Sequence, residues 1–206
     1  MVIHEHNHFD IRNVGGILLE KLVIKGGNQL NGRVRVSSAK NAVLPIIAAT
    51  LLASTPSKLL EIPNLEDVGT ISQVIESLGV KITRNEADDE IIFDASMLTA
   101  TEAPYELVRK MRASFLVMGP LLARKGEAKI SMPGGCAIGA RPIDLHLKAF
   151  EALGAKIEIT EDYVYAHAPE GLQGTQIYLD FPSVGATENV IMAASMAKGK
   201  TVIENA

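Results

Sequence analysis

The sequence predicts an α/β fold in which apolar helices form the centre and sheets lie around them, the reverse of an ordinary α/β barrel. The composition supplies an aliphatic core, because 47% of the residues are hydrophobic but only 4% are aromatic. An order of helix, polar turn and strand occurs three times, with Ala53, Ala123 and Ala197 at equivalent places. The first helix of each repeat is apolar around its whole circumference, and this pattern predicts burial on every side.

The net charge and the single cysteine exclude several classes of protein. A formal net charge of −4 over 206 residues argues against a general nucleic-acid or membrane-surface binder. One cysteine allows no internal disulfide, which is typical of a reducing compartment. Apolar runs such as residues 42–53 are too short and too rich in alanine to span a bilayer. We therefore expect a soluble cytoplasmic protein with no metal and no cofactor.

Residues 1–20 are expected to be an unstructured leader. They contain His4, His6 and His8, an alternation that could chelate zinc if it lay on a strand. No second group of ligands accompanies these histidines, since His146 and His167 are isolated in the sequence. The unstructured leader is therefore the preferred interpretation. The folded pattern begins near Leu22, and residues 21–36 are expected to form strands.

Each repeat is predicted to be a βαβαββ unit of about 70 to 75 residues. Residues 32–96 and 105–169 contain complete units. The third unit begins near residue 174, and the chain ends at Ala206, before the second helix and the closing strands of that unit. We therefore expect residues 37–206 to form one domain whose third repeat is truncated.

The second helix and the closing strand recur at matching places in the two complete repeats. The helix is predicted to end at Gly79 in the first repeat and at Gly154 in the second, since glycine adopts the left-handed conformation that ends many helices. A closing strand follows at residues 91–95 and again at residues 163–168.

The starts of the three first helices carry candidate ligand-binding residues. The first start holds Lys40 and Asn41, the second is expected to begin at Arg109 and holds Arg112, and the third holds Ser183 and Val184. Because the repeats are equivalent, their helix starts are expected to lie at the same end of the domain. A cation at a helix N-terminus is unfavourable by roughly a few tenths of a kcal/mol, so stability does not explain Lys40 or Arg112. An anionic ligand explains both, because the free N–H groups of helix starts also bind anions. Ordinary solvated charges are the alternative for either cation alone.

The stretch at residues 133–142, Pro-Gly-Gly-Cys-Ala-Ile-Gly-Ala-Arg-Pro, is the most informative part of the sequence. Glycines on both sides of Cys136 favour a mobile loop. A thiol on such a loop is exposed, and the nearby guanidinium of Arg141 favours its thiolate. A buried structural cysteine is the alternative, but no apolar periodicity surrounds Cys136. Pro142 and Asp144 suit the start of a helix that follows the loop.

Four segments together resemble the UDP-N-acetylglucosamine 1-carboxyvinyltransferase family, the enolpyruvyl transferases that begin peptidoglycan precursor synthesis. The resemblance covers about residues 21–206 and corresponds to the N-terminal half of such an enzyme. The related shikimate-pathway enolpyruvyl transferases share the repeated fold but are not expected to carry the cysteine loop. The four segments are residues 40–41, 111–114, 133–145 and 183–187.

The resemblance implies an enolpyruvyl-transferase-like fold, an inside-out α/β barrel. It also implies a second domain of the same design, which closes over the substrates. Residues 21–36 are expected to join the sheet of that second domain. It implies transfer of the enolpyruvyl group from phosphoenolpyruvate to the 3′-hydroxyl of UDP-N-acetylglucosamine, with release of phosphate, through addition and elimination. These two molecules are the expected partners, with no nucleic acid and no membrane. The reaction is the first committed step of cell-wall synthesis and so bears on cell shape and cell division.

The resemblance also implies roles for individual residues. Cys136 matches the general acid that helps to protonate the methylene carbon of phosphoenolpyruvate, and it matches the cysteine alkylated by fosfomycin. Lys40 and Arg112 match residues that hold phosphoenolpyruvate and nearby groups of the sugar nucleotide, and Asn41 matches a neighbouring substrate contact. The expected nucleotide contacts are Arg141, Pro142, Ile143, Asp144, Leu145, Phe181, Pro182, Ser183 and Val184.

The sequence departs from the family pattern in several respects. Ser38 stands where glycine is usual, and Leu116 stands where some members have tryptophan. The family's C-terminal half, which supplies an aspartate for the sugar hydroxyl and further arginines, is absent, so we expect negligible turnover from this chain alone. Two alternatives are a non-catalytic sugar-nucleotide-binding or regulatory module and a purely structural repeat protein. The thiol of Cys136 argues against the first alternative, and the cations at the helix starts argue against the second.

Overall fold

The chain divides into two compact units, residues 1–36 and residues 37–206. The computed structural model describes residues 12–14, 17–19, 26–27, 29, 31–85, 90–132 and 143–206.

The first unit contains a short antiparallel hairpin in which β1 (Arg12–Val14) pairs with β2 (Ile17–Leu19). The sequence led us to expect an unstructured leader over residues 1–20, and these two paired strands lie within it. Residues 31–36, expected to be strand, contain none, and Val34 and Val36 are exposed. A strand needs a partner for its backbone hydrogen bonds, and no described segment of this unit supplies one.

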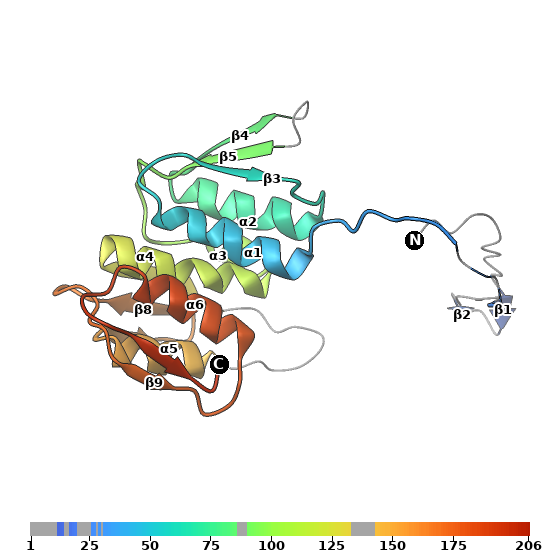
Figure 1. The fold of residues 1–206 in the computed structure, drawn as a ribbon. Coiled ribbons are helices and arrows are strands. Elements are labelled where there is room, and N and C mark those ends of the chain that lie inside the picture. Colours follow the sequence, from blue (N-terminus) through green and yellow to red (C-terminus); the bar gives the residue numbers. More distant parts are fainter. Residues whose placement is uncertain are drawn as a thin grey trace. The chain divides into compact units, whose positions relative to one another are not determined.

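The second unit contains the repeats (Figure 1). The first repeat comprises α1 (Lys40–Ala49), η1 (Thr50–Leu52), β3 (Ser57–Leu60), α2 (Glu66–Ser77), β4 (Lys81–Asn85) and β5 (Glu90–Asp94). The second comprises α3 (Tyr105–Val108), η3 (Arg112–Val117), α4 (Met118–Lys125), β6 (Glu127–Ser131), α5 (Asp144–Ala152), β7 (Lys156–Ile159) and β8 (Tyr163–His167). The third comprises β9 (Gln176–Tyr178), α6 (Val184–Ala194) and β10 (Val202–Glu204).

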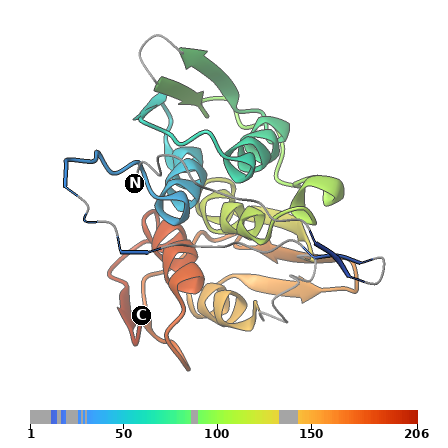
Figure 2. The ribbon, with the colours of Figure 1, turned by 90° about the vertical axis from the view of Figure 1, so that its right-hand side faces the viewer.

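The sheets repeat the same topology. The first has the order β3-β5-β4 and the second the order β6-β8-β7, and all neighbours in both are antiparallel. In the third repeat β10 pairs with β9 in parallel. Helices occupy the middle of the unit: α1 and α2 lie against the first sheet, α4 lies next to them, and α5 and α6 follow (Figures 1 and 2). The described residues therefore agree with helices inside and sheets outside, although they do not close a complete barrel.

Left-handed residues mark equivalent ends of elements. Gly79 has φ +101° and Gly154 has φ +95°, which confirms both as the glycines that follow a second helix. Glu61 (φ 55°) and Asn205 (φ 58°) come directly after β3 and β10. The spacing from Glu61 to Asn205 equals the spacing from Ala53 to Ala197, so the first and third repeats agree in backbone conformation as well as in sequence pattern.

The start of the second central helix differs from the expectation. A helix was expected from Arg109, but Arg109 ends α3 and Met111 is extended (φ −147°, ψ 122°), so that Arg112 is the first residue of η3. The extended conformation turns Met111 into the core, where it is 8% exposed. Burial of that apolar side chain explains the break.

Burial of the central helices on every side is confirmed for α4 but is wrong for α1 and α6. Met118, Leu121 and Leu122 of α4 are buried, whereas Ile46 of α1 is 50% exposed and Ile191 of α6 is 55% exposed. Both exposed side chains belong to helices that are rich in apolar residues, so an apolar composition did not ensure burial on every face. Among the described residues, every helix is too short or too polar to traverse a bilayer.

Candidate functional site

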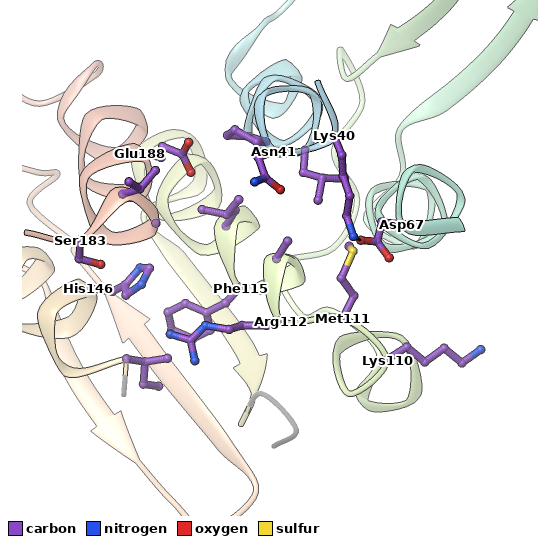
Figure 3. A pocket seen from close by; sticks show the side chains of 17 residues that line it. Lys40, Asn41, Asp67, Lys110, Met111, Arg112, Phe115, His146, Ser183 and Glu188 are labelled. Atoms are coloured by element: carbon purple, nitrogen blue, oxygen red, sulfur yellow. Dashed lines mark ion pairs between the residues drawn. The ribbon is translucent and has the colours of Figure 1, made fainter. Parts of the chain in front are cut away.

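A pocket of about 690 Å³ lies where the starts of α1, η3, α5 and α6 converge (Figure 3). Three of these elements are the first helices of successive repeats. The expectation that equivalent helix starts lie at one end of the domain is therefore confirmed for the described residues. The lining residues are Lys40, Asn41, Leu44, Pro45, Asp67, Lys110, Met111, Arg112, Ala113, Phe115, Leu116, Ile143, His146, Ser183, Val184, Gly185 and Glu188.

Many of the expected site residues come together here. The pocket contains the expected lysine, asparagine and arginine and three of the expected nucleotide contacts. These six residues are Lys40, Asn41, Arg112, Ile143, Ser183 and Val184.

The remaining expected residues do not line this pocket. Asp144 is exposed in the first turn of α5, while Leu145 is buried with 4% exposure. Phe181 and Pro182 are exposed just before α6. The residues of the cysteine loop, Cys136, Arg141 and Pro142, lie outside the described residues.

Lys40 is the first residue of α1 and forms an ion pair with Asp67 of α2. Asp67 lies in the first turn of α2, where a carboxylate also interacts favourably with the helix dipole. The ion pair directs the ammonium group of Lys40 across the gap between the two helices (Figure 3). Sequence reasoning missed Asp67, because an acidic residue in a first turn has an ordinary structural explanation.

His146 of α5 is 6% exposed and contacts the edge of Phe115, with the ring centroids 5.3 Å apart at 90°. The pKa of His146 is lowered to about 4, mainly by burial and also by the positive charge of Arg112, while the negative charge of Asp144 opposes the shift. The imidazole is therefore neutral at pH 7. Its Nδ1 lies 3.1 Å from Nδ2 of Asn189 on α6.

Ser183 caps α6, since its Oγ accepts a hydrogen bond from the N–H of Ala186 at 3.4 Å. Its carbonyl oxygen accepts from the hydroxyl of Thr187 at 2.8 Å. These contacts fix the direction in which α6 enters the pocket. Gly185, in the first turn, lines the pocket without a side chain.

Glu188 adds a carboxyl group to the pocket from the next turn of α6. Burial raises the pKa of Glu188, because the charged form loses hydration. Among the described lining residues, the cations Lys40, Lys110 and Arg112 outnumber the carboxylates Asp67 and Glu188. The pocket therefore favours an anionic ligand.

The pocket residues that sequence reasoning missed depend on distant parts of the chain. His146 was regarded as isolated, because its partner Asn189 is 43 positions away. Glu188 lies between Thr187 and Asn189 in α6, and its local sequence has no feature that points to the pocket.

The fold and the pocket define the class of protein: the chain belongs to the EPSP synthase (3-phosphoshikimate 1-carboxyvinyltransferase) family, which matches residues 24–206. Among curated proteins, it is 59% identical over 189 residues to UDP-N-acetylglucosamine 1-carboxyvinyltransferase 1 of Staphylococcus aureus strain N315. It is 60% identical over 188 residues to UDP-N-acetylglucosamine 1-carboxyvinyltransferase 2 of Carboxydothermus hydrogenoformans. These matches confirm the resemblance stated from the sequence.

The chain spans less than half the length of these relatives. Each match covers 91% of this chain, but 45% of the Staphylococcus protein and 44% of the Carboxydothermus protein.

Solved structures support the fold. The enolpyruvyl transferase NikO from Streptomyces tendae matches with a TM-score of 0.71 and 24% identity, over 86% of this chain and 41% of that one. An EPSP synthase from Acinetobacter baumannii matches with a TM-score of 0.63 and 18% identity, over 84% and 40% of the two chains. At these identities the likeness concerns the fold alone.

Proposed function

We propose that this chain carries the part of an enolpyruvyl transferase that binds phosphoenolpyruvate and UDP-N-acetylglucosamine. The proposed reaction moves the enolpyruvyl group to the 3′-hydroxyl of the sugar and releases phosphate, as the first committed step of peptidoglycan precursor synthesis in the cytoplasm. The observation that carries the proposal is the convergence of Lys40, Arg112 and the start of α6 on one pocket. The high identity to proteins that bear this activity in their name supports the choice of substrates.

Both proposed substrates are anions, which suits the charge of the pocket. A guanidinium such as that of Arg112 can bind a carboxylate or phosphate with two parallel hydrogen bonds. An ammonium such as that of Lys40 acts as a compact charge, and its ion pair with Asp67 holds it at the start of α1. We assign these two cations to phosphoenolpyruvate.

The sugar nucleotide is assigned to the side of the pocket formed by α5 and α6. Ile143, Ser183 and Val184 line the pocket there and are proposed as direct contacts, whereas Asn41 on α1 is proposed as a neighbouring substrate contact. Further contacts proposed from the resemblance lie outside this pocket or outside the described residues. They are Arg141, Pro142, Asp144, Leu145, Phe181 and Pro182.

The chemistry is proposed to proceed by addition and elimination. The 3′-oxygen of the sugar attacks C2 of phosphoenolpyruvate and its hydroxyl proton passes to a base, while C3 receives a proton, for which the thiol of Cys136 is the proposed donor. C3 of the tetrahedral intermediate then gives a proton to a base while the C2–O bond to phosphate breaks, so the double bond returns and phosphate leaves. The base for the sugar hydroxyl is, in this proposal, the aspartate from the second half of the longer relatives. Further groups come, in this proposal, from the second half of the longer relatives, so the isolated chain has negligible turnover.

Binding to the isolated chain tests the proposed site. Titration calorimetry with UDP-N-acetylglucosamine and with phosphoenolpyruvate should detect binding that Arg112→Ala weakens by about tenfold or more, because a charged hydrogen bond contributes roughly 1.5–3 kcal/mol. Arg84→Ala is the matched control, since Arg84 is an exposed arginine of β4 that does not line this pocket. Equal losses in both variants, in folded protein, would contradict the assignment.

Labelling by fosfomycin tests the role of Cys136. The adduct mass should appear at Cys136, form faster when UDP-N-acetylglucosamine is present, and be absent in Cys136→Ser. Phosphate release from both substrates should stay at background for the isolated chain. Measurable turnover would refute the proposed dependence on the second half.

A further inference from the structure

We propose that Asn189 is a positioning residue that holds His146 as a neutral imidazole with its proton on Nε2, facing the pocket. His146 thereby becomes a hydrogen-bond donor to an acceptor oxygen of the ligand, and not a general acid or base. The proton position rests on the geometry of the chain alone. The identity of the ligand rests on the proposed function.

The orientation of the Asn189 amide is determined by two backbone groups. The N–H of Gly119 donates to Oδ1 of Asn189 at 2.8 Å, so Oδ1 is the oxygen. Nδ2 of Asn189 donates to the carbonyl oxygen of Phe115 at 3.1 Å. A backbone N–H cannot accept and a backbone carbonyl cannot donate, so a flipped amide would lose both hydrogen bonds. Asn189 is fully buried, which makes that loss expensive.

The fixed amide determines the tautomer of His146. The second hydrogen of Nδ2 points to Nδ1 of His146 at 3.1 Å, so Nδ1 must accept. A neutral imidazole that accepts at Nδ1 carries its proton on Nε2. An imidazolium would place an N–H against the N–H of Asn189, so the contact also disfavours protonation.

The charges around His146 come from three elements. Arg112 on η3 disfavours the imidazolium, whereas Asp144 on its own helix α5 favours it. Glu188 on α6 lines the same pocket. The burial of the ring and the contact with Asn189 act in the same direction as Arg112.

The protonated nitrogen faces the start of α6 and the pocket. A Cβ placed on Gly185 would lie 3.9 Å from Cε1 and 4.0 Å from Nε2 of His146. Within the described part of the chain, no residue is recorded as a hydrogen-bond partner of Nε2. Figure 3 shows the ring between Ser183 and Phe115, on the same side of the pocket as Arg112. A ligand oxygen bound by Arg112 could therefore also accept from Nε2–H.

Nitrogen NMR of the chain labelled with ¹⁵N-histidine tests the tautomer without any ligand. The chain has five histidines, and His146→Gln identifies the relevant signals. In the unsubstituted chain we expect an unprotonated Nδ1 and a protonated Nε2, unchanged between pH 8 and pH 5. A proton on Nδ1 or an imidazolium at pH 6 would overturn the proposal.

In the variant Asn189→Asp, a side chain of almost the same size presents an acceptor oxygen to Nδ1 of His146 in place of the donor Nδ2. We expect the pKa of His146 to rise by about two units or more and a proton to appear on Nδ1. An unchanged pKa in folded Asn189→Asp would overturn the positioning role. If this variant does not fold, the NMR measurement of the His146 tautomer in the unsubstituted chain still tests the proposal.

Ligand-binding measurements distinguish a hydrogen-bond donor role of His146 from a purely structural role. His146→Gln keeps an N–H donor near the place of Nε2, whereas His146→Phe keeps the ring and removes the donor. For UDP-N-acetylglucosamine or phosphoenolpyruvate we expect about tenfold weaker binding of at least one ligand to His146→Phe, with substantial rescue in His146→Gln. Equal losses would overturn the donor role, whereas no binding of either ligand to the unsubstituted chain would count against the proposed function.

Discussion

The Cβ position of Gly119 overlaps the carbonyl and side-chain oxygens of Asn189, so the two central helices α4 and α6 meet where only glycine fits. The N–H of Gly119 also donates to Oδ1 of Asn189 at 2.8 Å. One glycine thus sets the distance between the second and third repeats and the orientation of the amide beside the pocket.

Gly119→Ala should lower the free energy of unfolding by about 2–3 kcal/mol, because a buried methyl group forces the helices apart. Urea denaturation measures the change. The matched control is Gly69→Ala in α2, where an added Cβ has nothing within 4 Å. That variant should gain about 0.5–1 kcal/mol from helix propensity. Equal effects of the two substitutions would contradict the close packing at Gly119.

Arg124 of α4 joins the first two repeats through backbone oxygens. Its Nη1 donates to the carbonyl oxygens of Leu51 at 2.8 Å and Ala53 at 2.7 Å. Arg124→Met keeps the apolar stem but leaves these acceptors without their donor, so we expect a loss of about 2–3 kcal/mol by thermal or urea unfolding. Arg109→Met, at an exposed residue of the same type, should change stability by less than about 0.5 kcal/mol.

Ile46 and Ile47 are neighbours on α1 with opposite surroundings. Ile47 has 0% exposure and Ile46 has 50%. Ile47→Ala should cost about 3 kcal/mol through lost burial and the cavity it leaves, whereas Ile46→Ala should cost less than about 1 kcal/mol. Urea unfolding of both variants measures these costs, and the slope of the free energy of unfolding against urea concentration should stay unchanged. A similar cost for both would mean that Ile46 is covered in solution.

The titration of His146 should make stability depend on pH. Its pKa in the folded chain is about 4, below the ordinary value of 6.5, so the unfolded state binds more protons between these values. The free energy of unfolding should therefore fall as the pH drops from about 6.5 to about 4, by up to about 3 kcal/mol from this group. Urea unfolding across this range should show a shallower fall for His146→Gln. Parallel curves for the two proteins would show that His146 does not carry the dependence.

Much of the fold followed from local sequence because local geometry selects it. Gly79 and Gly154 ended their helices as expected, since a left-handed residue after a helix is accessible to glycine without steric cost. The repeat pattern also placed Lys40 and Ser183 at helix starts, and the structure brings both to one pocket. The prediction for the start of the second central helix was less accurate, because the break at Met111 depends on burial of its side chain.

The sequence by itself determined the repeats, the helix ends after Ser77 and Ala152, and six of the residues that line the pocket, because these depend on patterns within a few turns of chain. Only the tertiary structure decided the ion pair of Lys40 with Asp67 and the hydrogen bond between His146 and Asn189. It also decided that Ile46 is exposed although α1 is apolar all round. Each of these depends on which distant segment packs alongside, and packing between repeats is a property of the assembled helices that no short window of sequence contains.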